Sequence, residues 1–244
     1  MPGPGGRLEL RGRDFHHLCR VLRLAAGDTV DAVDPEGGRW RLRLLQVGPA
    51  SCTAEAFAAA ATPAPSTGEP ALVLLQCLPK GRKMDLIIRQ AVEAGAVRVV
   101  PLVSDHAVAR PEEGSARLER WQRIAREARE QSGAARPAVI EPPVRLDEAI
   151  GRERVGTAVF FHEDPAGSSP LHGILAGAEG PFALLVGPEG GLSARETALL
   201  EASGFRRAWL GEGVLRTETA ALYALAAVRT IVREREAWRP SREG

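Results

Sequence analysis

The sequence predicts an α/β protein with a parallel sheet, preceded by a small β-rich domain. After residue 70, short apolar runs alternate with segments whose apolar residues recur at helical spacing. That alternation is typical of a parallel sheet covered by helices. Before residue 60, three short runs separated by turn residues predict strands joined by tight connections.

The N-terminal part of the chain predicts a little barrel or half-barrel. A short helix is expected at residues 14–22, with Phe15, Leu18 and Leu22 on one face. Three strands are expected after it, at residues 29–34, 39–47 and 51–57, with turns at Gly27-Asp28 and Gly37-Gly38. A segment this small buries little apolar surface by itself.

Residues 59–70, AAATPAPSTGEP, predict a linker because small residues, Pro, Ser and Gly dominate them. We therefore expect two domains, at residues 1–66 and 67–244.

The second domain predicts strands and helices in turn. Residues 71–78 are a continuous apolar run, as in a strand buried on both faces. A helix follows, with Gly95 as its stop signal and with apolar positions at Met84, Ile87, Ile88, Ala91 and Val92. Next come a strand at residues 97–103 and an amphipathic helix marked by Leu118, Trp121, Ala125 and Ala128. Further strands are expected at about 156–162, 182–187 and 206–210, and a largely apolar helix from about residue 217.

The composition excludes several classes of protein. No apolar run reaches the length of a membrane span, and MPGPGGRLEL contains no apolar signal segment, so we expect a cytoplasmic protein. The three widely spaced cysteines suit a reducing compartment. His16, His17 and Cys19 lie close together, but no second ligand pair at zinc spacing accompanies them, so no metal is expected. The net charge of +1 means that any RNA contact comes from local basic patches.

Three strand ends carry unusual residues, and ligands bind at the carboxyl ends of strands in open parallel sheets. At the first, two aromatics lead into His162-Glu163, which alone is an ordinary strand exit. At the second, residues 187–193 read GPEGGLS. Its glycines let a ligand approach the backbone, and Ser193 with Glu196 predicts a capping box. The loop lacks the Gly-Lys-Ser/Thr ending of a P-loop, and no G-x-S-x-G occurs.

The third strand end, residues 210–220, reads LGEGVLRTETA. It lacks the third glycine of a dinucleotide site and follows the last strand instead of the first. Thr217 is expected to cap the following helix, with Arg216 and Glu218 on either side of it. The charged pair then either serves a ligand or only fixes the loop.

Together, GPEGGLS and LGEGVLRTETAAL resemble the RsmE family of 16S rRNA uridine-N3 methyltransferases, which belongs to the SPOUT superfamily. The resemblance continues along nearly the whole chain, at residues 16–18, 21–24, 27–28, 80–85, 90–95, 121–125 and 130–133. The chain departs from the family's usual residue at His106, and the loop holding residues 162–164 is variable.

The resemblance implies a PUA-like β-barrel that binds RNA, followed by an α/β domain with a deep trefoil knot. A knot is too rare to be derived from pattern. The implied cofactor is S-adenosyl-L-methionine, held in a bent form between the two loops. The implied partners are 16S rRNA or the small ribosomal subunit and a second copy of the chain, which fits the apolar last helix.

The N3 atom of uridine becomes a nucleophile only when its imide proton leaves, which requires a base or a group that stabilises the anion. Arg216 is expected to anchor or polarise the uracil or a neighbouring phosphate. Glu189 and Glu218 are the candidate bases, or they only orient Arg216, and the residues leave these roles open. The expected cofactor-binding residues are Phe161, His162, Val186, Gly187, Pro188, Glu189, Gly190, Gly191, Leu210, Gly211, Val214, Leu215, Thr217 and Thr219. The expected RNA contacts are Arg13, Arg20, Arg23, Lys80, Arg82, Lys83 and Arg89.

Three other functions are weighed against this one. The same chemistry could act on tRNA or large-subunit rRNA, which would leave the pocket loops alike. A non-catalytic RNA-binding protein of ribosome assembly is disfavoured by the intact loops. A nucleotide-dependent enzyme is disfavoured because Walker and Rossmann elements are missing.

Overall fold

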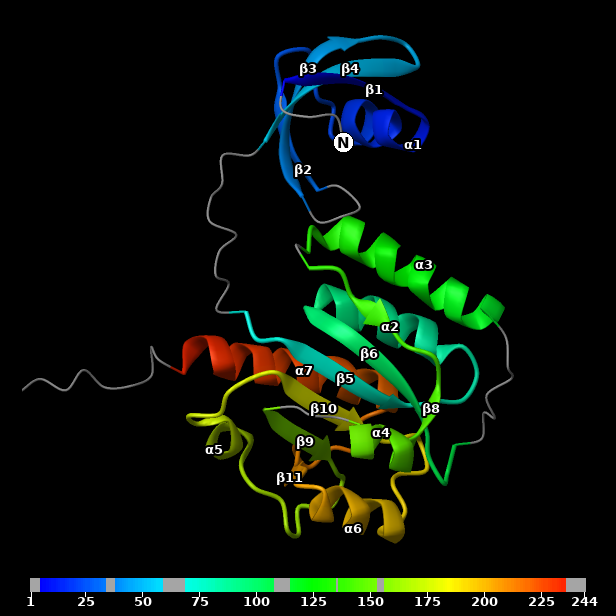
Figure 1. The fold of residues 1–244 in the computed structure, drawn as a ribbon, viewed down its shortest axis with the longest axis vertical. Helices are drawn as coiled ribbons and strands as arrows, with labels where there is room; N and C mark the ends of the chain where they lie inside the picture. Colours follow the sequence, from blue (N-terminus) through cyan, green and yellow to red (C-terminus); the bar gives the residue numbers. More distant parts are fainter. Residues whose placement is uncertain are drawn as a thin grey trace, which may run out of the picture. The chain divides into compact units, whose positions relative to one another are not determined.

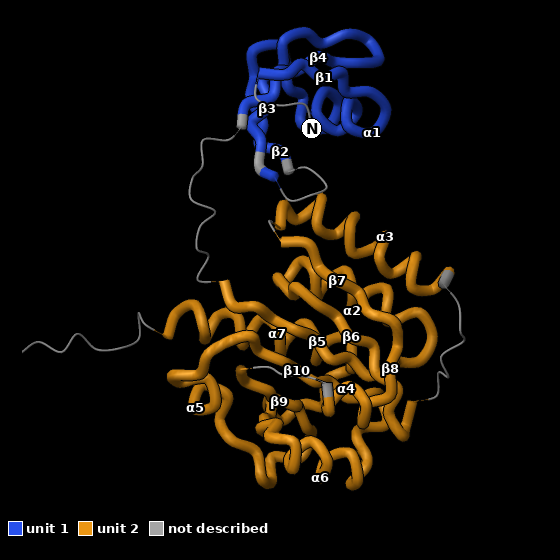
Figure 2. The backbone as a smooth tube through the Cα atoms, viewed as in Figure 1, with its two compact units in different colours: residues 1–67 blue, residues 68–244 orange. Residues whose placement is uncertain are grey.

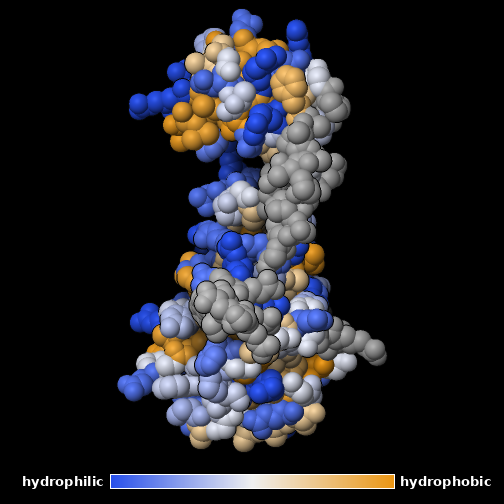
Figure 3. Space-filling model, turned by 90° about the vertical axis from the view of Figure 1, so that its left-hand side faces the viewer, coloured by the Kyte–Doolittle hydropathy of each residue, from blue (hydrophilic) through white to orange (hydrophobic). Residues whose placement is uncertain are grey.

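A computed structural model of the chain describes residues 5–33, 38–58, 69–107, 115–134, 136–152 and 156–235. The chain divides into two compact units, residues 1–67 and residues 68–244 (Figure 2). No helix in the described ranges is long and apolar enough to cross a membrane. Hydrophilic residues are interspersed with hydrophobic ones over the face of each unit that Figure 3 shows.

The first unit is built on a four-stranded antiparallel sheet. The strands lie in the order β1 (Gly6–Arg11), β4 (Ser51–Ala58), β3 (Arg39–Val47) and β2 (Thr29–Val33). The strands β2, β3 and β4 confirm the three predicted ones, although Asp34 and Gly37 lie outside the described residues. The edge strand β1 is an additional element. Its Leu8 and Leu10 alternate with exposed residues, which is the ordinary signal of a half-exposed strand.

A short helix packs on this sheet. It begins as α1 (Gly12–Phe15) and continues as a wider π-helical turn, η1 (His16–Val21). Phe15 and Leu18 are buried as predicted, and Phe15 contacts Leu44 and Cys52 in the core of the unit. Leu22 lies just beyond the helix and is exposed, so its predicted place on the buried face is wrong.

The second unit is a parallel α/β structure, as predicted. Its sheet runs in the order β11 (Arg206–Ala208), β9 (Thr157–Phe161), β10 (Phe182–Val186), β5 (Leu72–Cys77), β6 (Ala96–Val103) and β7 (Val139–Ile140), and β8 (Val144–Arg145) also pairs with β6. Every pairing is parallel. The two-residue strands β7 and β8 are too short to produce a periodicity that the sequence could reveal.

Helices cover both faces of this sheet (Figure 1). One face carries α2 (Lys83–Glu93), α3 (Ser115–Ser132), α5 (Leu171–Leu175) and α7 (Thr217–Glu234). The other carries α4 (Leu146–Arg152) and α6 (Ala194–Ala202). Successive side chains of β5 point to opposite faces of the sheet, since Leu74 belongs to the same buried cluster as Leu225 of α7 whereas Leu75 belongs to the cluster that contains Leu200 of α6. The strand is therefore buried at every position, with Gln76 as its one polar residue, which explains the long apolar run.

Parallel pairing brings the three unusual strand ends to one edge of the sheet. Phe161 at the end of β9 pairs with Val186 on one side and with Ala208 on the other. His162, Gly187 and Trp209 therefore leave the sheet side by side. The spacing of these segments along the chain is large, but the strand order β11-β9-β10 makes them neighbours.

Candidate active site

The loops that leave β9, β10 and β11 enclose a cavity of about 330 Å³. Such a volume suits a small organic ligand. Its walls combine apolar side chains with glycine-rich backbone. They are formed by Phe161, His162, Glu163, Val186, Gly187, Pro188, Glu189, Gly190, Gly191, Leu192, Trp209, Leu210, Gly211, Gly213, Val214, Leu215, Arg216, Thr217 and Ala220.

Residues Gly187–Leu192, which we call the glycine loop, connect β10 to α6. Gly191 adopts a φ of 70°, a left-handed conformation that favours glycine, and its N–H donates to Pro188 O at 3.0 Å. The loop ends at Ser193, which caps α6 in the predicted capping box: its hydroxyl accepts from Glu196 N, and Glu196 accepts from Ser193 N.

The second loop is tied to the glycine loop by a buried hydroxyl. Thr217 Oγ1 donates to Gly187 O at 2.7 Å and accepts from Gln76 Nε2 at 3.0 Å. Thr217 is the first residue of α7 and Arg216 occupies the N-cap position, so the predicted capping role of Thr217 is wrong. Its hydroxyl instead joins the start of α7 to the ends of β5 and β10 through long-range hydrogen bonds.

Lys83 unites the two candidate carboxylates. Its Nζ lies 2.8 Å from Glu189 Oε1 and 3.4 Å from Glu218 Oε2. The N–H of Lys80 donates to both oxygens of Glu189, at 3.3 and 3.2 Å. This cluster, Lys83–Glu189–Glu218, brings a residue predicted to bind RNA into contact with both predicted bases.

Electrostatics fix the protonation of this cluster. Burial acts to raise the pKa of Glu189, but the hydrogen bonds from Lys83 and the backbone outweigh it and leave that pKa below its usual 4.5. The hydrogen bond with Glu189 in turn raises the pKa of Lys83. At neutral pH the cluster therefore holds an ammonium group and the ionised carboxylate of Glu189. A carboxylate with a lowered pKa is a weak proton acceptor.

Arg216 lines the cavity and is exposed. Its side chain has no hydrogen bond or ion pair with any residue in the described ranges. Glu189 and Glu218 pair with Lys83, and neither forms a hydrogen bond or ion pair with Arg216. The guanidinium is thus available to a ligand.

The structure gathers most of the predicted residues around one cavity. Thr219 is the one predicted cofactor residue that does not line the cavity, and its side chain is exposed on α7. Glu218 lies outside the lining too, beside Lys83. The cavity also includes residues that were not predicted, and these are Glu163, Leu192, Trp209, Gly213 and Ala220. Each adjoins a predicted residue in the chain, so reading the whole strand-end segment would have found them.

The predicted RNA contacts fall on both units. Arg13, Arg20 and Arg23 are exposed on the first unit, and the guanidinium of Arg20 lies 5.8 Å from the centre of the Phe15 ring. Lys80 and Arg82 are exposed just before α2 on the second unit, and Arg89 is exposed in the middle of that helix. In the described part of the chain, no group of three His, Cys, Asp or Glu side chains could hold a metal ion.

Comparison with known proteins assigns the chain to a family. An RNA methyltransferase domain model matches residues 67–229, and an RNA methyltransferase PUA domain model matches residues 10–57. Ribosomal RNA small subunit methyltransferase E of Synechocystis is 34% identical, over 89% of this chain and 71% of that protein. The chain belongs to this RNA methyltransferase family. The enzyme of the same name from Mycobacterium bovis is 30% identical over 93% of this chain and 88% of its own length.

A solved member of the methyltransferase family has the same fold. Ribosomal RNA small subunit methyltransferase E from Neisseria gonorrhoeae, in a crystal structure bound to S-adenosyl methionine, aligns with a TM-score of 0.77 and 27% identity. The alignment covers 95% of this chain and 94% of that one. The resemblance inferred from the two loops is confirmed. The methyltransferase domain match spans both of them, and the PUA domain match falls within the first unit.

Proposed function

We propose that this protein transfers the methyl group of S-adenosylmethionine to N3 of a uridine in the RNA of the small ribosomal subunit. One observation carries the proposal: two glycine-rich loops close a cavity at the carboxyl ends of three adjacent parallel strands, with an unpaired arginine at its wall. The family membership supports the same reaction class.

The cavity suits this cofactor. Apolar side chains such as Phe161, Val186 and Leu215 offer a surface for a flat base, while the backbone of the two loops offers hydrogen-bonding groups for its edge and for the ribose. The S-adenosylmethionine bound to the Neisseria gonorrhoeae relative supports the assignment. When bound, the cofactor supplies a methyl group already activated on a positive sulfur, so the protein's task is mainly orientation.

Arg216 is proposed to hold the target uracil or an adjacent phosphate. Its guanidinium lines the cavity and has no partner among the described residues that would have to be displaced. A cation there stabilises the uracil anion that forms when the N3 proton leaves. A target base inside a stacked helix would have to be turned out to reach it.

Glu218 is proposed as the group that takes the N3 proton, and Glu189 as a residue that fixes Lys83. Glu189 is held by Lys83 and by the N–H of Lys80, and its lowered pKa makes it a poor base. Glu218 Oε2 is buried, lies beside Lys83 and accepts no hydrogen bond from the described residues. Glu218 is two residues from Arg216 but does not line the cavity, so the proposed proton transfer requires the uracil to approach it beside Lys83.

We further propose how the rest of the chain serves this reaction. The domains at residues 1–66 and 67–244 would divide RNA binding from catalysis. Exposed arginines of the first domain and basic residues near α2 would grip the RNA backbone. The second domain would carry the trefoil knot. A homodimer would cover part of α7, where Leu222 and Tyr223 are exposed. The protein would work in the cytoplasm without a metal.

The test is methyl transfer from labelled S-adenosylmethionine to small subunits that lack the modification, followed by nucleoside analysis. N3-methyluridine is the expected product, and a different methylated nucleoside, or transfer to another RNA only, would overturn the proposal. Arg216→Ala should lower turnover about 100-fold and leave cofactor binding intact. Glu218→Gln should lower turnover at saturating substrate much more than Glu189→Gln does.

A further inference from the structure

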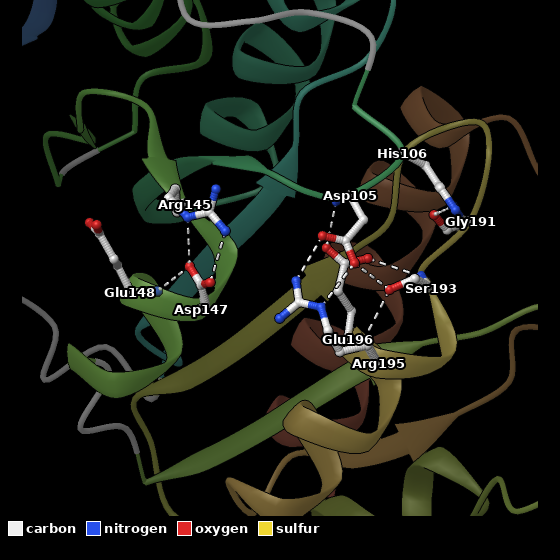
Figure 4. A network of polar contacts seen from close by, with 9 residues as sticks. All are labelled: Asp105, His106, Arg145, Asp147, Glu148, Gly191, Ser193, Arg195 and Glu196. Atoms are coloured by element: carbon white, nitrogen blue, oxygen red, sulfur yellow. Dashed lines mark hydrogen bonds and ion pairs between the residues drawn. The ribbon is translucent and has the colours of Figure 1, made fainter.

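We infer that the turn Ser104–Ala107, which follows β6, positions the glycine loop for cofactor binding, with His106 as the positioning residue. The inference rests on the proposed function. The turn is closed by a hydrogen bond of 3.0 Å from Ala107 N to Ser104 O. It lies beside the glycine loop although the two are more than eighty residues apart in sequence (Figure 4).

The glycine loop needs an external restraint. Within it, the hydrogen bond from Gly191 N to Pro188 O closes one turn. Gly190 and Gly191 have more backbone freedom than other residues, so fixing them costs more conformational entropy. A loop that is already ordered in the free protein loses little conformational entropy when the ligand binds, so the ligand binds more tightly.

His106 supplies such a restraint. Its Nδ1 lies 3.1 Å from Gly190 O and 3.2 Å from Gly191 O. Carbonyl oxygens only accept, so Nδ1 carries the proton and donates to both. Because each peptide group is planar, holding these two carbonyls also sets the directions of the Gly191 and Leu192 N–H groups.

The close approach of His106 explains why position 190 is a glycine. A Cβ atom on Gly190 would lie 3.3 Å from Cβ of His106 and 3.7 Å from its Cγ. Such a contact is tighter than ordinary van der Waals packing, so a larger residue would push the turn and the loop apart. The backbone of Gly190 thus packs directly on the His106 side chain.

The neighbouring residue Asp105 binds the start of α6, directly after the glycine loop (Figure 4). Its carboxylate accepts from Ser193 Oγ at 2.6 Å and from Arg195 at 2.7 and 3.2 Å. Its N–H donates at 2.8 Å to Glu196, which is fully buried and also accepts from Ser193 N at 2.9 Å. Releasing a buried carboxylate from its donors is costly, so this contact holds the turn against the start of α6.

The contacts that His106 makes are different from the contacts that cap α6. The capping box alone would keep α6 in place, and it makes no use of His106. The His106 ring instead binds two carbonyls inside the glycine loop, between Pro188 and Ser193. Its loss should therefore change the order of the loop more than the stability of the unit.

The test compares His106→Ala and His106→Asn with the wild-type protein. Asn places an N–H donor close to the position of Nδ1 and should rescue what Ala removes. The matched control is Arg145→Ala, which breaks the exposed Arg145–Asp147 pair drawn nearby in Figure 4 without touching the loop. Affinity for S-adenosylmethionine is measured by calorimetry, and hydrogen exchange of the peptide covering residues 187–193 is measured in the free protein.

We expect His106→Ala to weaken cofactor binding about tenfold and to speed exchange in the loop, with an unchanged kcat at saturating cofactor. His106→Asn and Arg145→Ala should stay within about threefold of the wild type. Equal affinity and equal exchange in His106→Ala would overturn the inference, as would a failure of Asn to rescue. A wild-type protein that binds no S-adenosylmethionine would sink the proposed function instead, and the exchange data would still test the role of His106.

Discussion

Replacing Thr217 by Val tests whether the hydroxyl group at the start of α7 holds together the two loops that line the cavity. Valine keeps the shape of threonine but removes the donor to Gly187 O and the acceptor for Gln76 Nε2. Both Thr217 and Gln76 are buried, so water cannot replace the lost bonds without a rearrangement. Gln76 keeps a second contact, to Cys77 O at 2.9 Å, but Gly187 O loses its donor.

The magnitude follows from these contacts. Leaving a buried polar group without its partner costs about 1–3 kcal/mol. Here Gly187 O loses its donor, and Gln76 Nε2 loses one of its two acceptors. We expect the free energy of unfolding to fall by about 2 kcal/mol, which lowers the melting temperature by about 4–8 °C for a domain of this size. The affinity for S-adenosylmethionine should fall as well, since Gly187 lines the cavity.

The assay is thermal unfolding of the full chain together with calorimetric titration of the cofactor. Thr217→Ser is the control, since it keeps the hydroxyl and should retain most of the affinity. A Thr217→Val protein that melts within about 1 °C of the wild type and binds the cofactor equally well would refute the reasoning.

Three further predictions concern the charged groups around the cavity. Lys83→Met leaves the Glu189 and Glu218 carboxylates without their shared cation, so the pKa of Glu189 should rise and methyl transfer at neutral pH should fall about tenfold, as a pH–rate profile would reveal. Asp105 has a pKa held below its usual 3.8 by Arg195 and Ser193, so it stabilises the fold above that pH and loses this contribution as the pH falls through its folded value. Urea unfolding should therefore show Asp105→Asn to be less stable than the wild type at about pH 6, with a gap that narrows below about pH 3.8, and a gap independent of pH would contradict the assignment. Glu196→Ala removes the acceptor of two backbone N–H groups and should cost about 1–3 kcal/mol of unfolding free energy, measured against Glu201→Ala on the exposed face of α6.

Local patterns predicted most of the elements because their physical causes are local. The apolar run of β5 and the helical spacing of α2 follow from burial on two faces and on one stripe. Parallel pairing then brought the predicted strand ends together, since strands that point the same way end at the same edge. The family resemblance supplied what pattern could not, namely the cofactor and the target RNA.

The features of the site that the sequence did not predict depend on contacts between residues far apart in the chain. Lys83 stands in the basic run of residues 80–83, which fits an RNA contact, and its partner Glu189 is 106 residues away. Thr217 has a residue type that suits a helix cap, but Gly187 and Gln76 offer it stronger long-range partners. The role of His106 depends on the carbonyl groups of Gly190 and Gly191, which no side-chain pattern can reveal.

The cavity is lined by two kinds of segment, strand ends and glycine-rich loops, which differ in how their backbone is held in place. Strand-end residues such as Phe161 and Val186 line the cavity, and the pairing of the sheet already holds their backbone in place. Glycine-rich loops allow a ligand close to the backbone, but the same freedom would let them drift. In this chain each loop is therefore tied from outside: the glycine loop by the Ser104–Ala107 turn and by Lys80 and Lys83, and the second loop by Thr217. Arg216, like Glu163, is a charged wall residue without such a tie among the described residues, which leaves its guanidinium available for the proposed contact with the RNA.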